Sequence, residues 1–164
     1  MSTAIPPIVL VFSASDPTGG AGMQADIMTL SSMGCHALSV ITAITAQDTA
    51  GVEDILAMEP EWVIDQARLV LEDMQVAAFK IGLLGSVENI AAIAEIVSDY
   101  PQIPLILDPV LASGRGDDMA TEDMISARAA GPPQWQAAPP MTAFMSMRAT
   151  ARRVLPWRAS CPSS

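Results

Sequence analysis

Apolar residues in the first 130 positions form two kinds of segment, short continuous runs and longer runs with a helical period. Residues 8–14 form a continuous apolar run that is short enough for a buried strand. Residues 21–33 then place apolar side chains at spacings of three and four, which predicts a helix that Gly34 can end. The same patterns predict strands over 37–46, 52–58, 77–81 and 105–108, and helices over 60–74, 87–99 and 121–128.

The predicted strands alternate with the predicted helices, and several strands are apolar throughout. This order is typical of an α/β fold, in which a mostly parallel sheet is covered by helices on both faces. Right-handed crossovers would connect the parallel strands. The residues at the helix starts agree with this assignment, because Pro60 suits a first helical turn while Ser86 and Thr121 suit helix caps.

The pattern stops at residue 131. No helical or strand period continues beyond this point, and six of the 13 prolines lie between residues 132 and 162. All 18 acidic residues lie between Asp16 and Asp123, so residues 1–130 carry a net charge of −14 and residues 131–164 carry +4. We therefore predict one folded domain over 1–130 and an irregular tail, rich in proline, arginine and tryptophan, over 131–164.

Composition narrows the class of protein further. Apolar residues make up 51% and charged residues 16% of the 164 positions, which is typical of a globular chain. The net charge of −10 argues against a nucleic-acid partner, because phosphate binding needs a basic face. No apolar run approaches the ~20 residues that span a bilayer, and no basic stretch resembling a signal peptide precedes the first apolar run. With two cysteines, Cys35 and Cys161, a cytoplasmic location is expected.

Four segments lie at the carboxyl ends of predicted strands, where open α/β sheets bind ligands. They cover residues 15–22, 45–51, 82–85 and 108–116. The first contains Gly19, Gly20 and Gly22 between a strand and a helix, so a ligand can approach the backbone closely there. Neither a Walker A lysine nor the dinucleotide-binding glycine spacing is present, and a tight turn without a ligand explains the glycines equally well.

The other three segments contribute single candidate residues. The amide of Gln47 offers a donor and an acceptor that match the edge of an aminopyrimidine, although an exposed loop glutamine is the simpler interpretation. Leu83 would form a wall of an apolar slot, and Lys80 is either a buried, paired lysine or one that faces the edge. Asp108 at a strand end can hold Mg²⁺ near phosphates, usually through water, or can merely cap a turn.

Taken in order, these segments resemble hydroxymethylpyrimidine/phosphomethylpyrimidine kinase of thiamine biosynthesis, a family of the ribokinase-like superfamily. The resemblance extends over about residues 7–128. It rests on four motifs: DPTGGAGMQAD at 16–26, SVITA at 39–43 leading to AQDT at 46–49, KIGLL at 80–84, and LDPV at 107–110. Pyridoxal kinases share this fold, but their early loop differs.

The resemblance implies phosphorylation of 4-amino-5-hydroxymethyl-2-methylpyrimidine and of its monophosphate by ATP with Mg²⁺. Carried over by position, Gln47 would bind the aminopyrimidine, and Asp108 would lie near the metal and the phosphates. Many relatives have methionine where this chain has Leu83, and either side chain fills an apolar wall. A homodimer is implied as well. The residues that would line the pyrimidine pocket are Gly20, Ala21, Leu83 and Val110.

The sequence departs from the family pattern after residue 128. A Thr-Pro-Asn strand end and a Gly-Thr-Gly-Cys or Gly-Thr-Gly-Asp anion hole, both typical of the family, do not occur. No residue is therefore nominated as the catalytic base, and we expect the chain to be truncated and inactive as a kinase. The tail composition suggests out-of-frame reading, which translation of the other frames of the gene would test.

Three alternatives to a pyrimidine kinase stay open at this point. The chain could be a non-catalytic module that still binds the pyrimidine, or an enzyme similar to pyridoxal kinase. It could also be a polypeptide that does not fold stably, because an incomplete parallel sheet exposes an apolar edge.

Overall fold

The computed structural model describes residues 5–108, 120–132 and 135. Strands and helices alternate along most of this range, as the hydrophobic pattern predicts, and the observed bounds agree with the predicted ones to within one or two residues. In chain order the elements are β1 (Ile8–Ser15), α1 (Gly22–Ser32), β2 (His36–Gln47), β3 (Val52–Ala57), α2 (Pro60–Asp73), β4 (Ala78–Ile81), α3 (Val87–Asp99), β5 (Leu105–Leu107) and α4 (Glu122–Ala129).

The five strands form one sheet in the order β3-β2-β1-β4-β5. β1 pairs in parallel with β2 on one side and with β4 on the other, and β4 pairs in parallel with β5. β3 is antiparallel to β2, because the connection over 48–51 is too short for a parallel crossover. The carboxyl ends of β1, β2, β4 and β5 therefore meet at one edge of the sheet.

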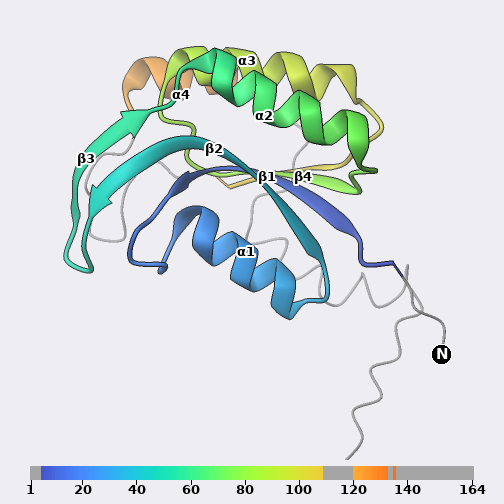
Figure 1. Cartoon of the computed structure of the whole chain (residues 1–164). Helices are drawn as coiled ribbons and strands as arrows, with labels where there is room; N and C mark the ends of the chain where they lie inside the picture. The colour runs from blue at the N-terminus through green and yellow to red at the C-terminus, as the bar shows by residue number, and fades with distance from the viewer. Residues whose placement is uncertain (1–4, 109–119, 133–134, 136–164) are drawn as a thin grey trace, which may run out of the picture.

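Helices cover both faces of the sheet, which confirms the predicted fold class (Figure 1). α1 lies alone against one face, and α2, α3 and α4 lie over the other. The hairpin of β2 and β3 extends beyond the rest of the sheet and curves away from it. Within the described ranges, no helix is both long enough and apolar enough to cross a membrane.

The main apolar core fills the space between the sheet and the layer of α2, α3 and α4. Phe12 and Phe79 from neighbouring strands lie at its centre, with their ring centroids 6.2 Å apart, and Tyr100 contacts Phe79 edge-on. Trp135 belongs to the same core and is 4% exposed. The division of the chain after residue 130 stays a prediction, since most of the tail lies outside the described residues.

Local signals explain several of the element boundaries. The side chain of Ser86 accepts a hydrogen bond from the backbone N–H of Asn89, and Thr121 does the same for Met124, so both predicted caps are confirmed. Gly34 follows the end of α1 with φ +77°, a conformation that glycine adopts without the steric cost of a side chain.

Candidate functional site

The residues predicted to carry chemistry converge at the edge formed by the carboxyl ends of the parallel strands. The turn over 16–21 follows β1, Gln47 ends β2, the loop over 82–85 follows β4, and Asp108 follows β5. This convergence is a property of the topology, since parallel strands place their carboxyl ends on the same side of a sheet. The four segments are up to 92 positions apart in the chain (residues 16 and 108).

A buried carboxylate organises the turn after β1. Asp16 is 2% exposed, and its Oδ1 accepts a hydrogen bond of 2.7 Å from the backbone N–H of Thr18. Its Oδ2 accepts one of 2.9 Å from the Thr18 hydroxyl and one of 2.7 Å from the N–H of Ala21. The N–H of Gly20 donates to the hydroxyl oxygen of Thr18. These N–H groups are directed into the turn, so the turn is not an open cradle for phosphate.

The same contacts set the protonation of Asp16. Burial acts to raise the pKa of this carboxyl, but hydrogen bonds from the N–H and hydroxyl of Thr18 and from the N–H groups of Ala21 and Gly20 outweigh that effect. The pKa of Asp16 is therefore below its usual range, and the side chain is charged at neutral pH. Gly20 and Ala21 themselves are exposed at the edge, where a ligand can reach their backbone.

Gly22 allows the chain to pass from the turn into α1. Its φ is +58°, and a Cβ at this position would lie 2.4 Å from the carbonyl oxygen of Ala14. Both the backbone conformation and the space therefore require glycine. The GGAG pattern at residues 19–22 thus reflects two features, an exposed turn and a tight contact between α1 and β1.

A chain of hydrogen bonds connects this turn with Gln47. The amide of Gln24 accepts from the N–H of Asp16 and donates to Ser15 Oγ, each at 2.8 Å. The Thr45 hydroxyl lies 3.0 Å from the carbonyl oxygen of Ser15 and 2.8 Å from Gln47 Oε1. Gln47 is half-buried, its contact with Thr45 holds one side of the amide, and its amide nitrogen has no hydrogen-bond partner among the described residues.

Leu83 lies just beneath the edge. It is 5% exposed and forms a small apolar cluster with Ala14 and Ala43, against which Ile55 packs. Leu83 therefore packs against residues of β1 and β2, and its role as a wall of the pocket stays a prediction.

A charged cluster lies at the same edge, on the face covered by α1. Lys80 Nζ is 2.8 Å from Asp26 Oδ2 and 3.3 Å from Asp108 Oδ2, and all three side chains are largely buried. This decides between the two interpretations of Lys80, which is a buried, paired lysine. Asp108 likewise does more than cap a turn, since it shares the ammonium group with a carboxylate from α1.

Asp26 is a site residue that the sequence analysis did not nominate. Burial raises the pKa of its carboxyl, the nearby charge of Lys80 opposes that effect, and Asp108 adds to the increase, so the pKa is raised overall. The sequence does contain a signal for Asp26, because the spacing of Met23, Asp26 and Leu30 places them on one face of the helix. A carboxylate on the buried face of a helix needs a charged or hydrogen-bonding partner.

The cluster suits a hard cation in composition. Two carboxylates share one ammonium group, which leaves a net negative charge and free oxygen donors of the kind that Mg²⁺ prefers. No group of three or more potential ligands among histidine, cysteine, aspartate and glutamate occurs in the part of the chain that the structure describes.

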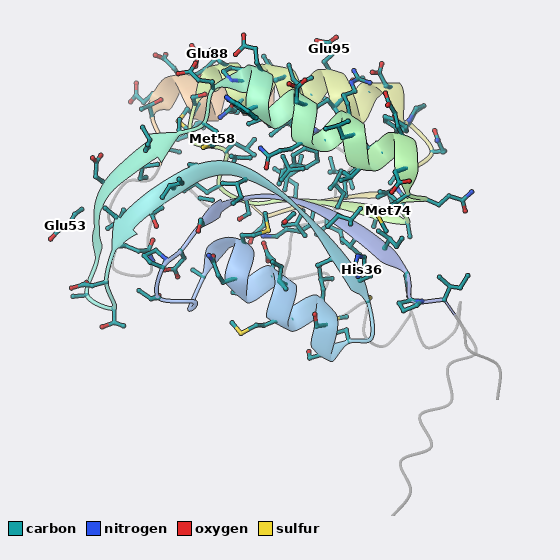
Figure 2. The ribbon with its side chains drawn as sticks, viewed as in Figure 1. His36, Glu53, Met58, Met74, Glu88 and Glu95 are labelled. Atoms are coloured by element: carbon teal, nitrogen blue, oxygen red, sulfur yellow. The ribbon has the colours of Figure 1, made fainter. Side chains whose placement is uncertain are left out.

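Two other side chains with potentially reactive groups lie away from the edge. His36 begins β2 at the opposite end of the strand from Gln47, and Figure 2 shows it far from the hairpin that carries Glu53. Cys35 packs beside the small apolar cluster of Val9, Val11 and Met23. Val110, the remaining predicted pocket residue, lies outside the described residues.

Comparison with known proteins agrees with this arrangement. The family model described as phosphomethylpyrimidine kinase matches residues 16–130, which is most of the chain. The chain belongs to the phosphomethylpyrimidine kinase family. The matched range begins at Asp16 and includes Gln47, Lys80 and Asp108.

Individual relatives carry the same description. The hydroxymethylpyrimidine/phosphomethylpyrimidine kinase of Streptomyces coelicolor is 42% identical over 112 residues, which cover 68% of this chain and 41% of that protein. Its counterpart in Escherichia coli is 36% identical, over 71% of this chain and 44% of that protein. The chain therefore spans less than half the length of these relatives.

Solved structures confirm the fold. A phosphomethylpyrimidine kinase from Clostridium difficile 630 superimposes with a TM-score of 0.69 at 36% identity, over 75% of this chain and 53% of that one. A pyridoxal kinase from Staphylococcus aureus in complex with AMP-PCP and pyridoxal matches with a TM-score of 0.62 at 28% identity, over 76% of this chain and 45% of that one. The family shares its architecture with kinases of other ring substrates.

Proposed function

We propose that this chain forms the pyrimidine-binding part of an ATP-dependent kinase that phosphorylates 4-amino-5-hydroxymethyl-2-methylpyrimidine and its monophosphate in thiamine biosynthesis. The observation that carries the proposal is the placement of Gln47, held by Thr45 at the carboxyl end of β2, at the same edge of the sheet as the exposed turn of Gly20 and Ala21. A half-buried amide with a free donor can pair with an aminopyrimidine ring nitrogen, and the exposed backbone can lie against the ring.

The position of the charged cluster supports the phosphoryl-transfer part of the proposal. Asp26, Lys80 and Asp108 lie at the same edge as Gln47, where the hydroxymethyl group and the phosphates of ATP would meet. Asp108 and Asp26 would hold Mg²⁺, and Lys80 would keep the two carboxylates close together. Bound Mg²⁺ would neutralise charge on the transferred phosphoryl group.

Calorimetry on the purified chain tests the pyrimidine site directly. We expect the pyrimidine to bind the wild-type chain, and Gln47→Leu to weaken binding by about 10- to 100-fold, because an amide partner is lost from a site built for hydrogen bonding. Gln102→Leu is the matched control, since Gln102 is exposed in the turn before β5. Equal affinities of the wild type and Gln47→Leu would contradict the proposal.

Turnover separates the kinase from a module that only binds. Release of ADP and formation of the phosphorylated pyrimidine, followed by mass spectrometry with ATP and Mg²⁺, would show catalysis by this chain. Binding without turnover would favour the non-catalytic module.

Pyridoxal is the second ligand to test, because the S. aureus pyridoxal kinase has the same fold at 28% identity. Tighter binding of pyridoxal than of the pyrimidine would favour the alternative enzyme class. A homodimer and a cytoplasmic location stay predictions, and sedimentation of the purified chain would test the first of them.

A further inference from the structure

Asn89 is a buried polar residue in the first turn of α3 that the candidate site does not use. It is 0% exposed, and its backbone N–H donates to the side chain of Ser86, the residue that caps the helix. The outer side of the same helix carries the exposed Glu88, which Figure 2 shows pointing away from the sheet. Asn89 points the other way, toward the strands.

The side-chain amide of Asn89 joins three segments that are distant in sequence. Its Nδ2 donates to the carbonyl oxygens of Thr42 at 3.1 Å, Met58 at 3.0 Å and Leu84 at 3.1 Å. These carbonyls belong to β2, to the residue after β3, and to the loop after β4. Met58 is labelled in Figure 2 where the chain leaves β3 toward α2. One amide group therefore ties the loop over 82–85 to the β2–β3 hairpin.

Two further contacts hold the same loop from the opposite side. The Thr42 hydroxyl donates to the carbonyl oxygen of Leu83, and this contact is buried. A Cβ added to Gly85 would lie 3.0 Å from Ala43 Cβ and 3.2 Å from Ala57 Cβ, so the loop already touches both strands of the hairpin. The hydroxyl of Thr42 and the amide of Asn89 thus hold the adjacent carbonyls of Leu83 and Leu84, respectively.

An asparagine is a costly choice for this position. Its Oδ1 is buried and has no hydrogen-bond partner among the described residues. The unpaired oxygen carries a desolvation cost, but the same amide is the donor for the carbonyl oxygens of Met58 and Leu84, which an apolar side chain would leave without it. The donor contacts thus fix the position of the loop relative to the hairpin.

We propose that Asn89 is a positioning residue for the pyrimidine pocket, which sets the distance between the apolar wall at Leu83 and the amide of Gln47. The inference rests on the proposed function, because Leu83 and Gln47 are the pocket residues it connects. Asn89 touches neither the ligand nor the reacting atoms. It acts through the loop that carries Leu83 and through the strand that ends in Gln47.

The test compares two variants within one helix. Asn89→Leu removes the donor and keeps the volume, whereas Ile96→Ala weakens the core two turns later on α3, where Ile96 is 1% exposed. Affinities for the pyrimidine and for pyridoxal are measured by calorimetry, with the folded fraction followed by circular dichroism. We expect Asn89→Leu to weaken pyrimidine binding by about tenfold and to reduce the preference over pyridoxal, since a small shift of a wall misaligns the ligand.

Ile96→Ala should leave the preference for the pyrimidine over pyridoxal unchanged, even if it lowers the stability of the fold more than Asn89→Leu does. Thr42→Val removes the hydroxyl that binds the carbonyl of Leu83 and keeps the volume of the side chain at position 42. It should cause the same loss of pyrimidine affinity and preference, and it replaces Asn89→Leu in the test if that variant does not fold. If Asn89→Leu or Thr42→Val keeps the wild-type preference for the pyrimidine over pyridoxal, the inference is overturned and the proposed function still stands. Absence of pyrimidine binding by the wild type would overturn the proposed function and the inference with it.

Discussion

The face of the sheet under α2, α3 and α4 contains a continuous apolar core, whereas the face under α1 combines a small apolar cluster with ion-paired side chains. The first core joins residues from seven of the nine elements, and the buried members of the second cluster among the described residues are Val9, Val11 and Met23. Beside that cluster lie Asp26 and Lys80. One face thus supplies most of the stability, and the other supplies charge at the edge where ligands bind.

Strand β4 shows this division within two consecutive residues. Phe79 points into the large core and is fully buried, and Lys80 points toward α1 and joins Asp26 with Asp108. Successive side chains of a strand face opposite sides of a sheet, so a single strand can serve both layers. Substitutions at these two positions therefore separate packing from electrostatics.

The largest expected effect is on the apolar face. Phe79→Ala removes an aromatic side chain that contacts both Phe12 and Tyr100, so we expect the free energy of unfolding to fall by about 3–5 kcal/mol. Urea unfolding followed by circular dichroism measures the loss. The folded fraction of this variant should bind the pyrimidine with an affinity within about twofold of the wild type, because substitutions far from a site usually change its energetics little. A loss below 1 kcal/mol would contradict the assignment of stability to this face.

A smaller loss of stability with a different pH dependence is expected on the charged face. Lys80→Met keeps most of the stem and leaves Asp26 and Asp108 without their shared cation, which should cost about 2–3 kcal/mol at pH 7. The charge of Lys80 opposes the increase in the pKa of Asp26 that burial causes, so removing the ammonium raises the pKa of this carboxyl further in the folded state. The deficit should therefore shrink as the pH falls through that raised pKa and Asp26 becomes protonated.

Unfolding free energies of wild type and Lys80→Met, measured between pH 4 and pH 8, check this expectation. Lys80→Arg is the matched control because it retains a cation in the same place. A deficit of the same size at every pH would show that Lys80 acts through packing and not through its charge.

The smallest of the three effects concerns the turn after β1. The pKa of Asp16 is below its usual range, so the charged carboxyl stabilises the folded state at neutral pH, and this contribution is lost as the pH falls through the lowered pKa of the folded state. Asp16→Asn should lower the free energy of unfolding by about 1–2 kcal/mol at pH 7, and the difference should shrink as the pH falls through that lowered pKa. Asp48→Asn, in the exposed β2–β3 turn, is the control.

Much of the fold could be predicted from the hydrophobic pattern. Continuous apolar runs located the strands, and apolar spacings of three and four located the helices; α3 matches its predicted range at both ends. The antiparallel pairing of β3 was not specified by the pattern, because periodicity reports which residues are buried and not the direction of a neighbouring strand. The direction follows from the short connection between β2 and β3.

The candidate site was predicted less completely. Motif resemblance located Gln47, Leu83 and Asp108 at strand ends, and the structure brings these segments to one edge. Asp26 and Asn89 were missed, since their importance depends on partners 54 and 47 positions away in the chain. A buried polar side chain is recognised by what it contacts, and a single sequence does not contain those contacts.

The sequence by itself determined the family, the order of the elements and the turn that follows β1, because these depend on local spacing, glycine and short motifs. Only the tertiary structure decided that Lys80 is paired and that the N–H groups of the turn bind Asp16. It likewise decided that one amide, that of Asn89, connects three segments. The physical reason is that hydrogen bonds and ion pairs act over about 3 Å in space, between residues that the fold must first bring together.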